Sequence, residues 1–455
     1  MMLFALLLLA GIPDWVPARW SSSDTQSLEL VRRTPINCLL LEQRHWSAEF
    51  TARAAEAGIA TLGVVRPGDQ IDELACRVAA ARLAGVVLEG DFEPPVVARL
   101  RQELADSRLV AVELPSRVRM RLDENLPVVG TWQGVWPGIN AQEDGAAKAA
   151  PSGAPWIDTN TGFLRFVRAV TDATVWIGVT PPPKTVLPTA RYLQAIGDAA
   201  IAGARWILAL DDDSTPRLLA REPAALAGWD RIALHLRYFE QHRQWRGWGP
   251  HGQLALVQDV TSGSLFSGAI LDMIATKHTP VRAVPVRKLS EHRMQGAKMA
   301  VNVDPAALAE AEKETLRRFT RAGGTLLTAP PGWKFPVQQP DQITLPKEDV
   351  EKLDAIWRDV NSMTGRRNLG VRLFNVSSMV SHLLAAPSGS PLLVHLVNYS
   401  DHAVESVALL VPGKVRQATV FEPGVPPRRL TLYDHEEGTG IELERVTTLA
   451  TVLIE

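Results

Sequence analysis

The sequence predicts an α/β protein that begins with a (β/α)8 barrel, and two observations lead to this prediction. Eight short apolar runs recur between residues 15 and 211, and helix-length amphipathic segments separate most of them, as in a chain of parallel strands alternating with helices. Four of the runs end in a carboxylate, and the carboxyl ends of the strands form the active-site face of such a barrel. The runs cover residues 15–20, 36–42, 59–65, 85–89, 109–113, 127–132, 174–179 and 205–211.

Capping residues mark the helices between the early runs. Ser21-Ser22-Ser23-Asp24 supplies N-cap residues for the first helix, and Ser47 caps the second helix, which ends at Gly58. Pro94 and Pro95 open the fourth helix, at positions where a missing backbone N–H costs little. These signals favour helices as the connections between the strands.

The alternation weakens in the second half of this region. A long loop, rich in Gly, Ala and Pro, extends from residue 133 to about residue 156, and a loop of this length inside a barrel is more often functional than idle. Helices are expected over 188–202 and roughly 222–245. The cluster Trp245–Pro250 then indicates the end of a barrel domain that spans residues 13–248.

Residues 249–345 predict a smaller, doubly wound α/β domain of flavodoxin-like type, because strands again alternate with helices. Asp304 and Pro305 mark the start of one helix, and Gly323-Gly324 ends it. The loop Thr261-Ser262-Gly263-Ser264 resembles a phosphate cradle, but it lacks a Walker or G-x-G-x-x-G pattern, so a phosphate site is not favoured. The expected strands are 254–260, 281–286, 298–303 and 325–328.

The remaining chain predicts a linker helix and a C-terminal antiparallel β-sandwich. Apolar residues recur at helical spacing within residues 346–369. Residues 370–455 contain only short strand-like runs separated by Gly, Pro and Asn or Asp turns. The expected strands are 371–374, 392–398, 406–411, 418–421, 429–433, 440–443 and 448–454.

The composition limits the classes of function. A chain of 455 residues, 46% hydrophobic and 22% charged, has the make-up of a globular protein with two or three domains. The net charge is −2, so nothing favours nucleic acid or an anionic membrane, which call for a basic patch. Cys38 and Cys76 lack metal-ligand spacing and are expected to be buried, and the first run has no His-x-His pair. We therefore expect no metal and no cofactor.

The N-terminal segment, residues 1–12, has the short apolar core of a signal peptide. It is too short to span a bilayer and lacks the positive residues of a strong signal. A cleaved signal peptide would place the protein in the periplasm or outside the cell. The alternative is a buried first strand or cap in a cytoplasmic protein. No other segment of the sequence is long and apolar enough to cross a membrane.

Three segments resemble beta-galactosidases of glycoside hydrolase family 42 and their relatives. Residues 191–206, which include Tyr192, Leu193, Gly203, Ala204 and Arg205, resemble the last barrel helix entering the eighth strand. Leu316-Arg317-Arg318-Phe319, followed by Gly323-Gly324-Thr325-Leu326-Leu327, resembles the amidotransferase-like middle domain. Val394-His395-Leu396-Val397-Asn398-Tyr399 resembles the closing sandwich. The resemblance implies a barrel, a middle domain and a sandwich in this order, and a carbohydrate as the ligand.

One segment departs from that family. The resemblance implies an acid/base glutamate at the end of the fourth strand and a nucleophilic glutamate at the end of the seventh strand. Glu89 matches the first position, but the seventh run ends in Val179-Thr180-Pro181-Pro182-Pro183, without a carboxylate. Either another strand supplies the second carboxylate, or the protein is not a hydrolase.

Carboxylates near the strand ends are the candidate catalytic residues. Glycoside hydrolysis usually needs two, about 5 Å apart for retention or roughly 6.5–9.5 Å apart for inversion, and one of them must stay protonated. Glu89 is the first choice because it ends a central strand; its alternative role is a helix cap or an ion pair with a barrel arginine. Candidate partners, each with the same structural alternative, are Glu113, Asp158 on the long loop, and Asp211.

Further residues near the strand ends are candidates for sugar binding. Arg44 and His45 follow the second strand and carry the donors that would hold a sugar hydroxyl. Indole faces suit the apolar faces of sugar rings, although a tryptophan at a strand end more often fills an interface. The full set is Trp20, Glu42, Arg44, His45, Trp132, Trp136, Trp156 and Asn160.

Two functions remain open from the sequence. The first is a glycoside hydrolase that acts on a carbohydrate through strand-end carboxylates, and the second is a non-catalytic carbohydrate-binding or assembly protein on the same scaffold. If no two carboxyl groups at the barrel mouth lie within about 10 Å of each other across an open cleft, the second function is favoured. The middle domain has no cysteine to act as a nucleophile, and we expect it to help form a homo-oligomer.

Overall fold

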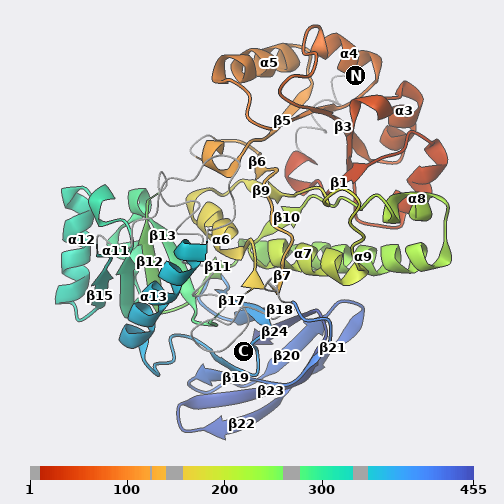
Figure 1. The fold of residues 1–455 in the computed structure, drawn as a ribbon. Coiled ribbons are helices and arrows are strands. Elements are labelled where there is room, and N and C mark those ends of the chain that lie inside the picture. The colour runs from red at the N-terminus through yellow and green to blue at the C-terminus, as the bar shows by residue number, and fades with distance from the viewer. Residues whose placement is uncertain (1–10, 123–124, 140–156, 260–276, 331–346) are drawn as a thin grey trace. The chain divides into compact units, whose positions relative to one another are not determined.

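The computed structural model describes residues 11–122, 125–139, 157–259, 277–330 and 347–455. The chain forms two compact units: the first comprises Met1–Val135, Asp172–Ile196 and Ala204–Gln241, and the second comprises Trp136–Thr171, Gly197–Gly203 and His242–Glu455 (Figure 1). Several predictions lie outside the described residues: nearly all of the signal segment, most of the long loop with Trp156, and the Gly/Ser loop at 261–264.

The first unit contains eight parallel strands in two sheets. Five of them follow one another in sequence order: β1 (Pro17–Trp20), β2 (Cys38–Leu41), β3 (Ala60–Val65), β4 (Gly85–Glu89) and β5 (Val110–Leu114). The other sheet has the order β10 (Ala204–Trp206), β9 (Thr174–Ile177) and β6 (Val128–Thr131). The predicted parallel α/β fold is confirmed.

The two sheets join at one edge. Arg19 N–H donates to the carbonyl of Leu208 at 2.7 Å, and Leu208 N–H donates to the carbonyl of Pro17 at 3.2 Å, which makes a parallel bridge between β1 and the residues after β10. At the other edge β6 packs beside β5, without a backbone pairing within the described residues. Closure into a barrel therefore stays a prediction.

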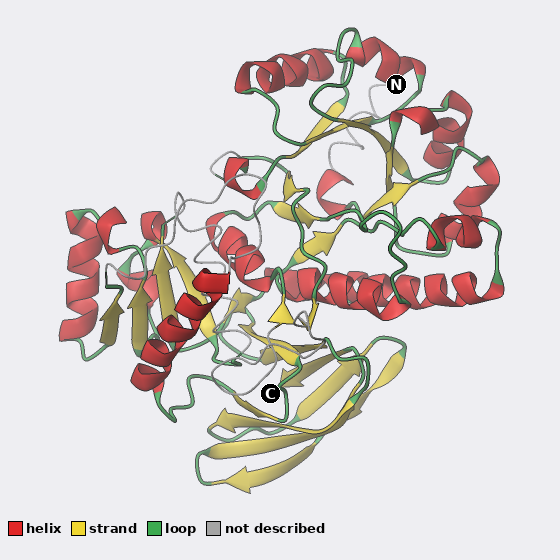
Figure 2. Ribbon diagram, in the orientation of Figure 1, coloured by secondary structure: helices red, strands yellow, loops and turns green. Residues whose placement is uncertain are grey.

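One hydrophobic core lies between these strands. Its side chains come from both sheets and are almost all below one-tenth exposed: Ile12, Trp15, Cys38, Leu40, Ala60, Leu62, Val64, Val87, Val110, Val112, Leu114, Val128, Trp176 and Ile207. Figure 2 shows the helices of this unit on the outside of the strands. The strands thus bury one face on each other and the other face under helices, as near-continuous apolar runs require.

The helices of the first unit begin where the capping residues predict. The side chain of Ser47 accepts a hydrogen bond from Phe50 N–H at the start of α3, and Gly58 follows the end of α3 with a φ of 76°. Pro94 and Pro95 are the first residues of α5. The helices are α2 (Leu28–Arg32), α3 (Ala48–Glu56), α4 (Leu74–Ala80), α5 (Pro94–Asp106), α7 (Thr189–Ile201), α8 (Ser214–Leu219) and α9 (Pro223–Gln241), with short 3-10 turns at η1 (Ile12–Asp14), η2 (Thr25–Ser27), η3 (Gln43–His45) and η4 (Arg117–Arg119).

The two cysteines differ from the sequence-based prediction. Cys38 is buried in β2, as expected, but Cys76 is exposed on α4, so the prediction for Cys76 is wrong. The buried face of α4 is formed by Leu74, Ala75 and Val78, and the helical turn of about 100° per residue directs position 76 away from that face. Both thiols are free.

The second unit contains a four-stranded parallel sheet with the order β13 (Val281–Pro285), β12 (Leu254–Gln258), β14 (Met299–Asn302) and β15 (Thr325–Thr328). Counted along the chain, this order is second, first, third, fourth, which is the beginning of a doubly wound sheet. The described helices and turns before the antiparallel part are α6 (Thr161–Val170), η5 (Arg243–Gly247), η6 (Val286–Lys288), α11 (Glu291–Met294), η7 (Pro305–Ala307), α12 (Glu310–Arg321) and α13 (Lys347–Thr364).

The C-terminal part of the second unit consists of antiparallel strands, as predicted. A six-stranded sheet has the order β11 (Gly249–Pro250), β17 (Met379–Ala385), β18 (Leu392–Asn398), β24 (Leu449–Ile454), β20 (Ala418–Glu422) and β21 (Val425–Arg429). A four-stranded sheet has the order β16 (Arg372–Phe374), β19 (Val404–Pro412), β23 (Gly438–Val446) and β22 (Thr431–His435). The inner faces of both sheets contribute to a single core. A separate short pair joins β7 (Gly138–Ile139) and β8 (Ile157–Asp158).

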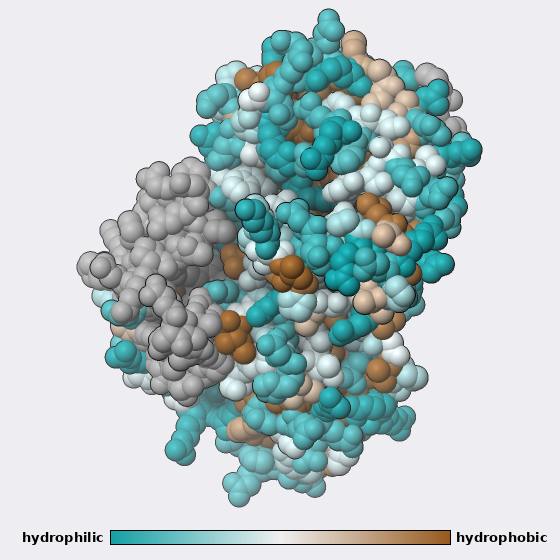
Figure 3. Space-filling view, turned by 45° about the vertical axis from the view of Figure 1, so that its right-hand side comes forward, coloured by the Kyte–Doolittle hydropathy of each residue, from teal (hydrophilic) through white to brown (hydrophobic). Residues whose placement is uncertain are grey.

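The described helices and the surface can be compared with what a membrane span requires. Within the described residues, none of the helices combines the length and the apolarity that crossing a bilayer requires. On the face shown in Figure 3, hydrophobic residues lie in small scattered groups among hydrophilic ones, as is normal for the surface of a folded protein.

Candidate functional site

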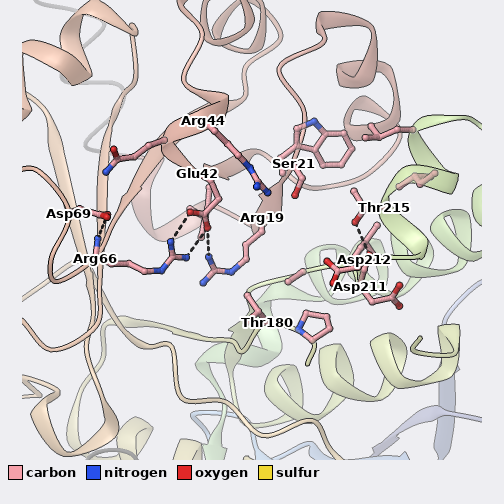
Figure 4. Close-up of a pocket in the computed structure, with 18 residues that line it drawn as sticks. Arg19, Ser21, Glu42, Arg44, Arg66, Asp69, Thr180, Asp211, Asp212 and Thr215 are labelled. Carbon is pink, nitrogen blue, oxygen red and sulfur yellow. Dashed lines mark hydrogen bonds and ion pairs between the residues drawn. The ribbon is translucent and has the colours of Figure 1, made fainter. Parts of the chain in front are cut away.

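A cavity of about 460 Å³ lies at the carboxyl ends of the strands of the first unit. Ligand pockets commonly enclose about 300–1,000 Å³, so the cavity is large enough for a small molecule. Figure 4 shows its lining, which is rich in charged side chains. The lining residues are Arg19, Trp20, Ser21, Leu40, Glu42, Gln43, Arg44, Arg66, Asp69, Thr180, Pro181, Ala209, Leu210, Asp211, Asp212, Thr215, Leu218 and Leu219.

Four charged side chains from four consecutive strands form a cluster at this edge, which we call the rim quartet. Arg19 lies near the end of β1, Glu42 follows β2, Arg66 follows β3 and Glu89 ends β4. The signs alternate along the sheet, and each carboxylate contacts both guanidinium groups. Because neighbouring parallel strands end at the same edge, the register of the sheet brings these four residues together.

The contacts within the rim quartet are close and directional. Arg66 donates from Nη1 to Glu42 Oε2 and from Nη2 to Glu42 Oε1, both at 2.7 Å, which is a bidentate pair. Arg66 Nε also donates to Glu89 Oε1 at 2.9 Å. Arg19 donates through Nη2 to Glu89 Oε2, and its Nη1 lies 3.6 Å from Glu42 Oε1. Figure 4 shows Glu42 between the two guanidinium groups.

The two carboxylates of the rim quartet lie near each other. Arg66 Nη2 is 2.7 Å from Glu42 Oε1 and 2.8 Å from Glu89 Oε1, so these two oxygens are at most about 5.5 Å apart. This separation suits retaining hydrolysis, for which two carboxyl groups lie about 5 Å apart. The space between them, however, is occupied by a guanidinium group.

The arginines keep these carboxylates as hydrogen-bond acceptors. The hydrogen bonds from Arg66, and the charges of Arg66, Arg19 and Arg44, hold the pKa of Glu42 below its ordinary value although burial acts to raise it. Both oxygens of Glu89 accept from guanidinium groups, which are donors only. To act as a general acid, Glu89 would have to give up one of these bonds.

Asp211 lines the cavity, but both oxygens of its carboxylate already accept hydrogen bonds from neighbouring protein groups. Oδ1 accepts from the backbone N–H of Asp213 at 3.0 Å and of Ser214 at 2.7 Å. Oδ2 accepts from Leu187 N–H at 2.9 Å and from the Tyr192 hydroxyl at 2.7 Å. Burial acts to raise the pKa of Asp211, but these hydrogen bonds outweigh it and lower the pKa. Asp211 therefore fixes the turn that leads into α8.

The structure does not bring Glu113 and Asp158 into this cavity. Glu113 is in register with Leu88, whereas Glu89 is in register with Leu114, a residue of the core. Since side chains alternate between the faces of a strand, Glu113 and Glu89 lie on opposite faces, and Glu113 pairs with Arg101 of α5 and with Arg121. Asp158 belongs to the second unit, where it pairs with Gly138 in the β7–β8 ladder.

The predicted aromatic residues have different surroundings. Trp20 lines the cavity but is only 5% exposed, and its indole N–H donates to Ser27 Oγ at 3.0 Å. Trp132 is exposed outside the cavity lining, and Trp136 belongs to the second unit. Trp156 lies outside the described residues.

The remaining predicted polar residues also separate. Arg44 lines the cavity and donates from Nε to His45 Nε2 at 3.1 Å. Burial and the charge of Arg44 lower the pKa of His45. Asn160 is fully buried in the second unit, where its backbone N–H and Nδ2 both donate to Asp198 Oδ2 at 2.9 Å. Asn160 thus has a structural role.

Sequence reasoning missed the two arginines of the rim quartet and Asp212 as cavity residues. Arg19 is the penultimate residue of the first apolar run, and Arg66 directly follows the third run, so a search for cations as well as acids at the run ends would have found them. Among the described residues, no group of histidine, cysteine, aspartate and glutamate side chains has the arrangement of a metal site.

Comparisons with known proteins define the fold. No family model matches the chain, and no curated protein matches it in sequence. Among solved structures, alpha-L-fucosidase isoenzyme 2 from Paenibacillus thiaminolyticus is similar with a TM-score of 0.58 and 9% identity, over 97% of this chain and 99% of that chain. A rhamnosidase from Novosphingobium sp. PP1Y has a TM-score of 0.46 and 12% identity, over 90% of this chain and 39% of that chain.

The fucosidase is a glycoside hydrolase, and the likeness in fold agrees with the resemblance seen in the sequence at the level of the fold. At 9% identity, the similarity to the fucosidase defines the fold and not the activity. The fold of this chain is therefore glycoside hydrolase-like.

Proposed function

We propose that this protein binds a carbohydrate in the cavity of the first unit and does not hydrolyse it by a two-carboxylate mechanism. The fold likeness to an enzyme named for fucose release supports a sugar as the ligand. The cavity supports it as well, because exposed Asp212, Ser21 and Thr180 supply the kinds of polar groups that bind hydroxyls.

One observation supports the absence of hydrolysis above the others. Glu42, which lines the cavity, and Glu89, which lies outside the lining, are both bound by Arg19 and Arg66. A glycosidase needs one carboxyl group that delivers a proton to the leaving oxygen. A glutamate whose two oxygens both accept from guanidinium groups would have to give up one of these bonds in order to deliver a proton.

The proposal includes two features of architecture. The bridge between Ala18 and Leu208, the position of β6 beside β5 and the shared core support closure of the eight strands into a (β/α)8 barrel. The order of the parts, with parallel strands first and antiparallel strands last, supports a distant relationship to glycoside hydrolase family 42.

Binding and turnover are tested together on the full chain. We expect isothermal titration calorimetry with a panel of monosaccharides and oligosaccharides to find a ligand, and a screen of aryl glycosides to find no release of the phenol. The variant Asp212→Asn should weaken binding several-fold, since it removes the charge of an acceptor on the cavity wall. The matched control is Asp106→Asn, the same change at an exposed position of α5. Absence of sugar binding would refute the proposal.

A retaining hydrolase is the second candidate, favoured by the separation of at most about 5.5 Å between the carboxylates of Glu42 and Glu89. This candidate predicts turnover of an aryl glycoside that falls by orders of magnitude in both Glu42→Gln and Glu89→Gln. Turnover that is unchanged in Glu89→Gln would remove this residue from any mechanism.

A further inference from the structure

We infer that the ligand of the cavity is an acidic sugar, a hexuronic acid whose carboxylate is held by Arg44 and whose ring hydroxyls are held by Asp212. This inference rests on the proposed function and names the class of carbohydrate. Arg44 and Asp212 are charged residues of the cavity lining, and neither forms an ion pair within the described residues.

The arginines of the cavity differ in their partners. Arg19 and Arg66 are each bound to both glutamates of the rim quartet. Arg44 is exposed, and within the described residues its hydrogen bond is to neutral His45, with no ion pair to a carboxylate. Its two Nη groups are therefore available to a ligand. A guanidinium that offers two parallel N–H groups matches a carboxylate in a bidentate pair.

The acidic residues of the cavity also differ in their partners. Glu42 is compensated by Arg66, Asp69 accepts from Arg66 N–H at 2.8 Å, and Asp211 is saturated by hydrogen bonds. Asp212 is exposed and has no hydrogen bond or ion pair within the described part of the chain. In Figure 4, Arg44 and Asp212 lie on opposite sides of the cavity. A carboxylate accepts hydrogen bonds from two adjacent hydroxyls, so this side suits a sugar ring and the Arg44 side suits an anion.

The cavity lining also contains a buried hydrogen-bond donor without a partner. One nitrogen atom of the lining, Gln43 Nε2, is buried and has no hydrogen-bond partner within the described residues, and Arg19 Nη1 approaches Glu42 Oε1 only to 3.6 Å. A buried donor without a partner is destabilising. A ligand with acceptor oxygens beside Gln43 and Arg44 would supply the missing partner.

The test compares sugars that differ only in charge. Titration calorimetry on the full chain would use glucuronate, galacturonate and mannuronate, each beside its own methyl ester, which keeps the ring and removes the charge. We expect at least one uronate to bind about tenfold or more tightly than its ester, the difference of one charge-assisted hydrogen-bonded pair. Arg44→Gln should lower the affinity for the uronate to that for the ester. Arg53→Gln, at an exposed position of α3, is the matched control and should keep the full preference.

The outcomes of these titrations distinguish failure of the inference from failure of the proposed function. Equal affinity for uronate and ester, or a preference that survives in Arg44→Gln, would overturn the inference and leave the proposed function standing. Absence of binding to any sugar, charged or neutral, would overturn the proposed function and the inference with it. Circular dichroism of Arg44→Gln checks that the variant is folded, so that a lost preference reports on recognition.

Discussion

At the scale of single residues, Arg66 joins the two glutamates of the rim quartet. It makes a bidentate pair with Glu42 and a further hydrogen bond to Glu89. Glu89 is 8% exposed and Glu42 is half-buried. Removing the cation would leave two neighbouring carboxylates with fewer partners, and an unpaired charge in a protein interior is more costly than one at the surface.

We therefore expect Arg66→Ala to reduce the free energy of unfolding by about 1–3 kcal/mol, the lower end of the range for a buried pair because Arg66 is partly exposed. Urea unfolding at neutral pH measures the change. Arg53→Ala, which removes an exposed pair with Glu56, should cost less than about 0.5 kcal/mol. Equal effects of the two substitutions would show that the rim quartet behaves as an ordinary surface ion pair.

At the scale of elements, the second unit contains His395, which is buried in β18, and His278, which is partly buried in the turn before β13. His395 of β18 contacts Thr451 Oγ1 through Nδ1 at 2.8 Å, and His278 contacts the carbonyl of Val376 through Nε2 at 2.8 Å. Burial lowers the pKa of His395 to about 3, with the charges of His242 and Arg165 acting in the same direction, and lowers the pKa of His278 to about 4. Both histidines are therefore neutral in the folded protein near pH 7.

This pKa shift makes stability depend on pH with a definite sign. Below the ordinary histidine pKa of about 6.5, the unfolded chain binds a proton that the folded protein does not, so stability is full above about pH 6.5 and falls as the pH decreases toward the folded pKa. We expect the urea concentration at the midpoint of unfolding to decrease when the pH is lowered from 7 to 5. His395→Gln should make this dependence shallower, by about 1 kcal/mol per pH unit. His292→Gln, at an exposed position of α11, should leave the slope unchanged; an unchanged slope in His395→Gln would contradict the expected shift.

The elements also show which parts of the fold can be predicted from the sequence. The parallel strands were predictable because each is a compact apolar run flanked by a capped helix, and β15 has the bounds expected. Strand β17 was missed because Ser381 and His382 interrupt its apolar run, although all its residues are buried. Strand β21 was missed because it contains Pro426 and Pro427, which are tolerated there since β21 lies at the edge of its sheet.

The candidate site was less predictable than the fold for a physical reason. Strand ends can be located from local patterns, so Glu42 and Glu89 were found. The partner of each glutamate depends on the register between strands and on which face a side chain occupies, neither of which the local sequence states. For the same reason Glu113 was expected at the mouth, whereas it faces α5.

At the scale of the whole molecule, the sequence-based prediction of a homo-oligomer formed through residues 249–345 remains to be measured. We expect multi-angle light scattering of the full chain at micromolar concentration to give a mass of two or more times 49.7 kDa, the mass of one chain. A mass of one chain under these conditions would contradict the prediction. A dilution series checks the result, because the mass of a specific assembly falls at low concentration.

The rim quartet also bears on how far this protein stands from catalysis. Its two glutamates already have the spacing of a retaining pair, and a guanidinium separates them. A neutral side chain at position 66 would leave both carboxylates to share Arg19, and their mutual repulsion would raise the pKa of one of them. The asymmetry between a protonated and an ionised carboxyl group, on which glycosidases depend, would then arise from a single substitution.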